Sequence, residues 1–149
     1  MARLPFQILV FLYHRDPGGT FRYAVFHRAD RDVWLGIAGG GEGDESPEQA
    51  ARREALEESG VDANAAMIPL SSRGEVPVTE FHANTEWPTN LKTIPEFAFA
   101  IPATPESIRL SREHTAVDWL TFQDAAQRLE WTSNRRALAE LSAILTSAR

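Results

Sequence analysis

The sequence contains no cysteine among its 149 residues. Disulfide bonds, thiolate metal ligands and cysteine nucleophiles are therefore excluded. The lack of cysteine is compatible with a reducing compartment, and we expect the protein to be cytoplasmic.

Long apolar runs are also absent, and no segment approaches the length needed to cross a membrane. The apolar run at residues 5–13 is short, contains Pro5 and Gln7, and leads into charged residues rather than into the small residues of a cleavage site. We therefore interpret it as a buried strand and not as a signal peptide.

The third absence is a basic stripe. The chain has 15 Lys and Arg residues against 21 Asp and Glu residues, for a net charge of −6. Residues 42–58 contain seven acids and two arginines, a net −5, which leaves −1 for the rest of the chain. The acidity is therefore a local site. Long nucleic acid is an unsuitable partner for such a chain, whereas a small phosphate compound chelated by a metal is compatible.

The hydrophobic content of 43% and the aromatic content of 9% indicate one globular domain over residues 1–149. Apolar or alternating patterns predict strands, with a turn at residues 16–19 joining the first two. Helices are predicted to begin at Ser46, Thr121 and Ser133. The predicted strands lie at residues 7–13, 21–27, 33–37, 67–70, within 73–82, 97–101 and 116–120. Strands flanked by helices, with one helix inserted in mid-chain, indicate an α/β sandwich with a mixed sheet.

The mid-chain helix has clear start and stop signals. Ser46 supplies a hydroxyl for the free amides, Pro47 fits the first helical position, and Gln49 completes a capping box. Gly60 is a suitable stop. The sequence therefore predicts a helix between Ser46 and Gly60.

Glu54, Glu57 and Glu58 stand on this helix at positions i, i+3 and i+4, so their carboxylates share one face. Crowded carboxylates repel one another unless cations neutralise them, and Mg²⁺ or Mn²⁺ prefers such oxygen ligands. The alternative is a solvated acidic face. Glycines at both ends and Arg53 beside the cluster favour a metal site.

The residues 38–41, Ala-Gly-Gly-Gly, come directly before this helix. Glycine allows a close approach of the backbone to a ligand and positive φ angles. We expect a loop whose carbonyls and amides face metal and phosphates, rather than a plain flexible turn.

Residues 39–61 fit the pattern G-x5-E-x7-R-E-U-x-E-E-x-G-U, where U is aliphatic. The fixed matches are Gly39, Glu45, Arg53, Glu54, Glu57, Glu58 and Gly60. This stretch resembles the Nudix box, and Nudix hydrolases are α/β/α sandwiches with this order of elements. The resemblance implies that Glu54, Glu57 and Glu58, with the carbonyl of Ala38, hold divalent cations.

The resemblance also implies roles for the residues around these ligands. Arg53 would orient a catalytic glutamate, for which Glu57 is the candidate, and Glu45 would tie the loop to the helix. Gly39 and Gly40 are the predicted backbone contacts to substrate.

The C-terminal part resembles the branch that includes dihydroneopterin triphosphate and deoxynucleoside triphosphate pyrophosphatases. The resemblance lies in a Glu113-His114 pair before the last strand and in the Trp-Thr-Ser-Asn-Arg segment at residues 131–135. It makes Glu113 the candidate general base, with an ordinary loop carboxylate as the alternative. His114 is expected to be structural.

Substrate contacts are less well defined by the sequence. Arg28 and Arg135 are candidate phosphate contacts, with a solvated surface as the alternative. The polar segment 82–90 is a candidate loop on the substrate side. The aromatic residues Trp87 and Phe81 are expected in the core rather than stacked on a ligand.

The expected activity is Mg²⁺-dependent hydrolysis of a deoxynucleoside or dihydroneopterin triphosphate to a monophosphate and pyrophosphate, by a monomer or a homodimer. ADP-ribose, towards which Pro77 points weakly, and dinucleoside polyphosphates are alternative substrates. A sensor that binds a nucleotide without hydrolysing it is the alternative outside enzymes. The intact set of box glutamates argues against it.

Overall fold

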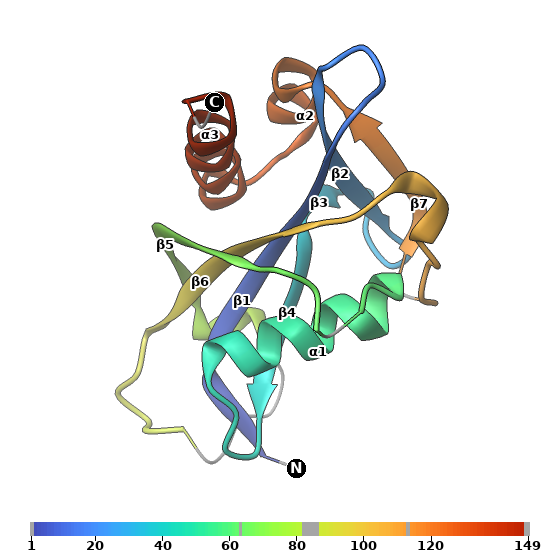
Figure 1. The fold of residues 1–149 in the computed structure, drawn as a ribbon. Coiled ribbons are helices and arrows are strands. Elements are labelled where there is room, and N and C mark those ends of the chain that lie inside the picture. Colours follow the sequence, from blue (N-terminus) through green and yellow to red (C-terminus); the bar gives the residue numbers. More distant parts are fainter. Residues whose placement is uncertain (1, 63, 82–86, 113, 148–149) are drawn as a thin grey trace.

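The computed structural model describes residues 2–62, 64–81, 87–112 and 114–147 (Figure 1). Within these ranges, seven strands form one sheet, and three α-helices and two short 3-10 helices accompany it. The elements are β1 (Arg3–Arg15), β2 (Phe21–Arg28), β3 (Trp34–Leu35), β4 (Ile37–Glu42), α1 (Pro47–Ser59), β5 (Ile68–Pro77), η1 (Val78–Glu80), β6 (Thr93–Pro102), η2 (Pro105–Ser107), β7 (His114–Leu120), α2 (Phe122–Arg128) and α3 (Thr132–Ser147). None of the helices in these ranges is long and apolar enough to span a membrane.

The sheet is mixed, and β1 lies at its centre. Its main strand order is β3-β2-β1-β6-β5, while β4 pairs with β1 and β7 pairs with β2. β1 and β6 run parallel, and the other pairs are antiparallel. This arrangement confirms the predicted mixed sheet.

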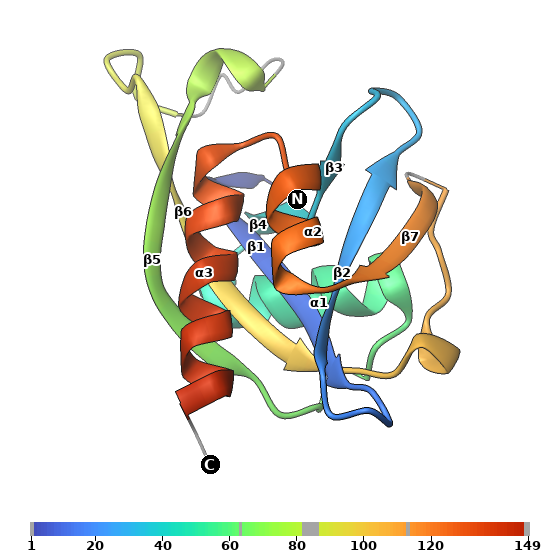
Figure 2. The same ribbon diagram turned by 90° about the horizontal axis from the view of Figure 1, so that it is seen from above.

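Helices cover both faces of the sheet (Figure 2). The strand period of two sends Ile8 and Val10 of β1 towards α1, and sends Leu9 and Phe11 towards α2 and α3. All four side chains are fully buried. The α/β/α sandwich therefore has two apolar layers, as the family resemblance implied.

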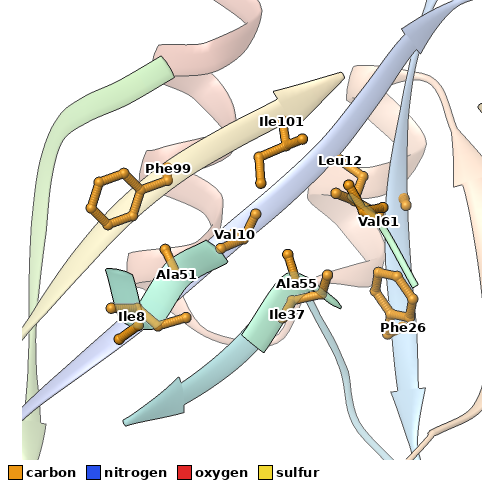
Figure 3. Close-up of a cluster of buried hydrophobic side chains, with 12 residues drawn as sticks. Ile8, Val10, Leu12, Phe26, Ile37, Ala51, Ala55, Val61, Phe99 and Ile101 are labelled. Carbon is orange, nitrogen blue, oxygen red and sulfur yellow. The ribbon is translucent and has the colours of Figure 1, made fainter. Parts of the chain in front are cut away.

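α1 has the predicted ends. The Ser46 hydroxyl accepts a hydrogen bond from the Gln49 amide at 3.1 Å, and the Gln49 side chain accepts one from the Ser46 amide at 2.9 Å. Gly60 ends the helix in the left-handed region, with a φ of 76°. The helix packs on the sheet mainly through alanines, and Figure 3 shows Ala51 and Ala55 among the apolar side chains of the sheet.

The glycines before α1 do not form the expected loop. Gly39, Gly40 and Gly41 lie in β4, and the positive φ angles in the described residues occur at other glycines. Close packing explains why residues 40 and 41 are glycines. A Cβ at Gly40 would lie 2.6 Å from the Arg3 guanidinium carbon, and one at Gly41 would overlap the Phe6 ring. Both glycines therefore make room for β1 side chains.

Two further boundaries differ from the sequence prediction. The pieces predicted at residues 67–70 and 73–82 form one strand, β5, which ends at Pro77, where the chain turns into η1. α3 begins at Thr132 rather than at Ser133, so Ser133 lies inside its first turn. Part of the predicted 82–90 loop lies outside the described residues. Trp87 is buried, as expected, and its indole donates to the Arg3 carbonyl oxygen at 2.8 Å.

Candidate active site

Arg53 is the centre of a cluster of carboxylates on α1 and at the end of β4. Its guanidinium contacts four of them. The nitrogen to oxygen distances are 2.8 Å to Glu45, 3.0 Å to Glu54, and 3.2 Å to both Glu57 and Glu42. One cation thus faces four acids, and the cluster keeps an excess of negative charge.

Glu45 fixes the orientation of Arg53. Its two oxygens accept from two guanidinium nitrogens, and one of them also accepts from the Glu42 amide at 2.8 Å. Arg53 in turn donates to the Gly40 carbonyl at 2.8 Å. The hydrogen bonds with Arg53 lower the pKa of Glu45, and those with Glu45 raise the pKa of Arg53. Glu45 thereby ties β4 to α1.

Glu54 is the least solvated carboxylate of the four that contact Arg53, with its side chain 12% exposed. Burial raises the pKa of Glu54 to about 7, although Arg53 acts against this shift. The carboxyl group lies directly over Gly39, where a Cβ atom would overlap its carbon. Gly39 is therefore needed for the position of Glu54.

Gly39→Ala is expected to destabilise the protein by about 1–3 kcal/mol, because the added methyl group must displace Glu54 or β4. Activity should fall at the same time, since Glu54 moves within the cluster. Urea denaturation and a hydrolysis assay measure the two effects. Gly18→Ala is the matched control, because its Cβ meets only the Asp16 side chain, at 3.4 Å. Equal stability of the two variants would contradict the close contact.

Glu58 contacts residues outside α1. It is 5% exposed, and its Oε2 lies 3.0 Å from Nδ1 of His114 and accepts from the Ser111 hydroxyl at 2.9 Å. His114 is also buried and opens β7. The histidine expected to be structural therefore joins α1 to β7 through a carboxylate of the predicted metal site.

A cavity of about 550 Å³ lies over this cluster. Its lining includes Ala38, Gly39, Gly40, Arg53, Glu54, Glu57, Glu58 and His114. A second cavity, of about 390 Å³, shares Arg28, Ala38 and Phe81 with the first and extends towards β6 and the start of α3. The carboxylate cluster therefore opens into a second, less acidic space.

The structure brings most of the predicted residues together. Arg28 lines both cavities and forms an ion pair with Asp30 at 2.6 Å. Arg135 lines neither, and it donates to the carbonyls of Leu129 and Glu130 just before α3. These contacts give Arg135 a structural role there. Glu113 lies outside the described residues, so its role as the base stays a prediction.

The donor set suits a hard divalent cation by charge and chemistry. Carboxylate oxygens, which such cations prefer as ligands, outnumber the cationic groups in the cluster. The Arg53 guanidinium offsets only part of the cost of burying the charge of Glu54. In this structure Glu54 and Glu57 contact Arg53, and Glu58 contacts His114. In the described part of the chain, no three acidic or histidine side chains are grouped closely enough to hold a metal ion. A bound ion would therefore have to share Glu57 with Arg53 and Glu58 with His114.

Sequence reasoning singled out part of the lining of the second cavity, including Arg28 and the 131–135 segment, but it missed Gln7 and Glu96 as site residues. Gln7 of β1, Glu96 of β6 and Ser133 of α3 line it together with Trp131. Of the two missed residues, Glu96 carried a signal, because it is a single acid directly before the predicted apolar strand 97–101. Phe81 was expected in the core but lines both cavities.

Comparison with known proteins gives a consistent result. The family model of the NUDIX domain matches residues 7–141. The dihydroneopterin triphosphate diphosphatase of Escherichia coli K12 is 30% identical to this chain over 139 residues, which cover 91% of each chain.

Solved structures are similar along the whole chain. A protein of Listeria monocytogenes described as a NUDIX hydrolase superposes with a TM-score of 0.86 at 36% identity, covering 97% of this chain and 96% of that one. The E. coli dihydroneopterin triphosphate pyrophosphohydrolase superposes with a TM-score of 0.77 at 26% identity, covering 97% and 99%.

Proposed function

Because this chain belongs to the NUDIX hydrolase family and is a pyrophosphohydrolase of that family, we propose that it hydrolyses a phosphoanhydride bond in a nucleoside triphosphate or dihydroneopterin triphosphate. The products are a monophosphate and pyrophosphate. The relative at 30% identity acts on dihydroneopterin triphosphate, which supports this class of substrate.

One observation carries the proposal, namely the pair of joined cavities. The first holds the carboxylate cluster organised by Arg53. The second has Phe81 and Trp131 among the six apolar residues of its lining, alongside nine polar or charged residues. A compound with a charged phosphate chain at one end and a flat ring at the other matches this division.

Nudix enzymes generally use divalent metal ions, and Mg²⁺ fits the oxygen donors present here, with Mn²⁺ as an alternative. We assign Glu54, Glu57 and Glu58, with the Ala38 carbonyl, as the ligands. A bound ion would neutralise phosphate charge and lower the pKa of a bound water.

The chain's own groups have separate tasks in this scheme. Arg53 holds Glu54 and Glu57 in position, and Arg28, at the boundary of the two cavities, is placed to contact a phosphate. A carboxylate accepts the proton of the attacking water, which displaces the leaving group in line. Glu113 is our candidate for this base, and Glu57 is the alternative. No covalent intermediate is needed.

The test is a substrate panel with Mg²⁺ and identification of the products. It contains deoxynucleoside triphosphates, dihydroneopterin triphosphate, ADP-ribose and a dinucleoside polyphosphate. We expect pyrophosphate from the triphosphates and loss of activity when EDTA removes the metal. Preferential cleavage of ADP-ribose, which releases no pyrophosphate, would contradict the proposed substrate class. Nucleotide binding without hydrolysis of any compound would favour a sensor instead.

A further inference from the structure

The second cavity contains a buried carboxylate that the hydrolysis does not use. Glu96 of β6 is 7% exposed and lines this cavity. It belongs neither to the Arg53 cluster nor to the contacts of Glu58. A carboxylate is seldom buried without partners, because its transfer from water is costly. Glu96 therefore needs an explanation.

The sheet holds Glu96 in a fixed place. In the register it lies between Gln7 of β1 and Gly74 of β5. Gly74 has no side chain, and a Cβ there would lie 2.8 Å from Cβ of Ser133 and 3.1 Å from Oε1 of Glu96. The glycine thus lets the first turn of α3 approach the sheet, so that Ser133 meets Glu96.

The described residues around Glu96 fill only part of the hydrogen-bonding capacity of its carboxylate. Burial raises the pKa of the Glu96 carboxyl, and a hydrogen bond from the Ser133 hydroxyl opposes this rise. The first turn of α3 also favours a negative charge at this position. A carboxylate has about four acceptor sites on its two oxygens, and among the described residues the Ser133 hydroxyl occupies one of them. Acceptor capacity is therefore left on the cavity side.

The chemistry of the missing partner follows from this geometry. A carboxylate pairs best with two parallel N–H donors. The 2-amino-4-oxopyrimidine edge, which guanine and pterin share, presents a ring N–H beside an exocyclic NH₂ group. Adenine and cytosine present one donor beside an acceptor, and thymine presents one N–H between two carbonyls. Among these rings, only guanine and pterin match both oxygens of an ionised carboxylate.

We propose that Glu96 is the residue that selects the ring of the substrate, by accepting two hydrogen bonds from a 2-amino-4-oxopyrimidine edge. This inference rests on the proposed function, because it names the ring of the same triphosphate. Trp131 and Phe81 also line the cavity and offer apolar surface to the flat ring. Arg28 and Ala38 connect the cavity to the carboxylate cluster, where the phosphates would lie.

The test is the substitution Glu96→Gln, which keeps the size of the side chain and an acceptor for Ser133 but replaces one acceptor by a donor. The wild type should prefer dGTP and dihydroneopterin triphosphate over dATP and dCTP. In the variant, kcat/KM for the two preferred substrates should fall about 10- to 100-fold, while the value for dATP stays within about 3-fold. Glu106→Gln, an exposed site in η2, is the matched control and should leave all values unchanged.

Several outcomes would overturn the proposal. One is a Glu96→Gln variant that keeps the wild-type preference while folding normally by circular dichroism. Another is a wild type that prefers dATP or dCTP. If no triphosphate is hydrolysed, the proposed function has failed, and tryptophan fluorescence then tests Glu96 separately. In that assay guanosine should bind more tightly than adenosine to the wild type and equally to the variant; equal binding to the wild type would refute the inference.

Discussion

Glu57→Gln is expected to lower kcat by at least about 100-fold while the protein stays folded. A charged group that faces the reacting phosphates typically contributes a factor of about 10² to 10³. The substitution removes one negative charge and one oxygen ligand from the assigned metal site. The side chain is 55% exposed, and Arg53 keeps its shorter contacts with Glu45 and Glu54. The loss of stability should therefore stay within about 0.5 kcal/mol.

Steady-state kinetics at several Mg²⁺ concentrations measure this effect, with thermal unfolding as the check on folding. Glu48→Gln is the matched control, since Glu48 lies on the same helix, is 62% exposed and lines neither cavity. Full activity in purified Glu57→Gln protein would refute the assignment of Glu57 to the metal site.

Arg53→Ala is expected to reduce both stability and activity, unlike Glu57→Gln. The guanidinium is 23% exposed and bridges Glu45, Glu54 and the Gly40 carbonyl. Its removal leaves these partly buried acids without a counter-charge. We expect a loss of about 3 kcal/mol in the free energy of unfolding, near the lower end of values for a broken buried pair, because part of the cluster reaches solvent.

The activity of Arg53→Ala should fall by at least about 100-fold, because Glu54 and Glu57 lose their common anchor. Arg53→Lys should recover little of it, since one ammonium group cannot reproduce the fork of contacts with Glu45. Arg52→Ala is the neighbouring control: Arg52 donates to the Ala65 carbonyl and lines neither cavity. Stability of Arg53→Ala equal to that of Arg52→Ala, by urea denaturation, would contradict the central role of Arg53.

The sequence was sufficient for α1 because the signals for that helix are local. Ser46, Gln49 and Gly60 act within one turn of the residues they cap, so their chemistry can be recognised in the linear sequence. The spacing of Glu54, Glu57 and Glu58 is local in the same way, and the common face of the three follows from helical geometry. The alternation of buried residues in β1 likewise follows from the strand period.

The remaining features depend on contacts between distant segments. Gly40 and Gly41 appeared to be loop residues, because only the packed structure shows Arg3 and Phe6 lying against them. The place of Glu96 depends on the register of β6 between β1 and β5, and on the position of α3. No pattern within β6 gives that information, so the sequence could not predict that Glu96 meets the start of α3 in a second cavity.

The apolar face of α1 has a consequence for local stability. The buried apolar residues of the helix are Ala50, Ala51 and Ala55, and its one leucine, Leu56, is 47% exposed. Alanine buries little surface, so the hydrophobic effect holds this helix weakly compared with β1. The helix is also attached by polar contacts, from Arg53 to Glu45 and from Glu58 to His114. We therefore expect the helix that carries the carboxylates to open at a lower free energy than the central strands, so that its amides exchange hydrogen sooner than theirs.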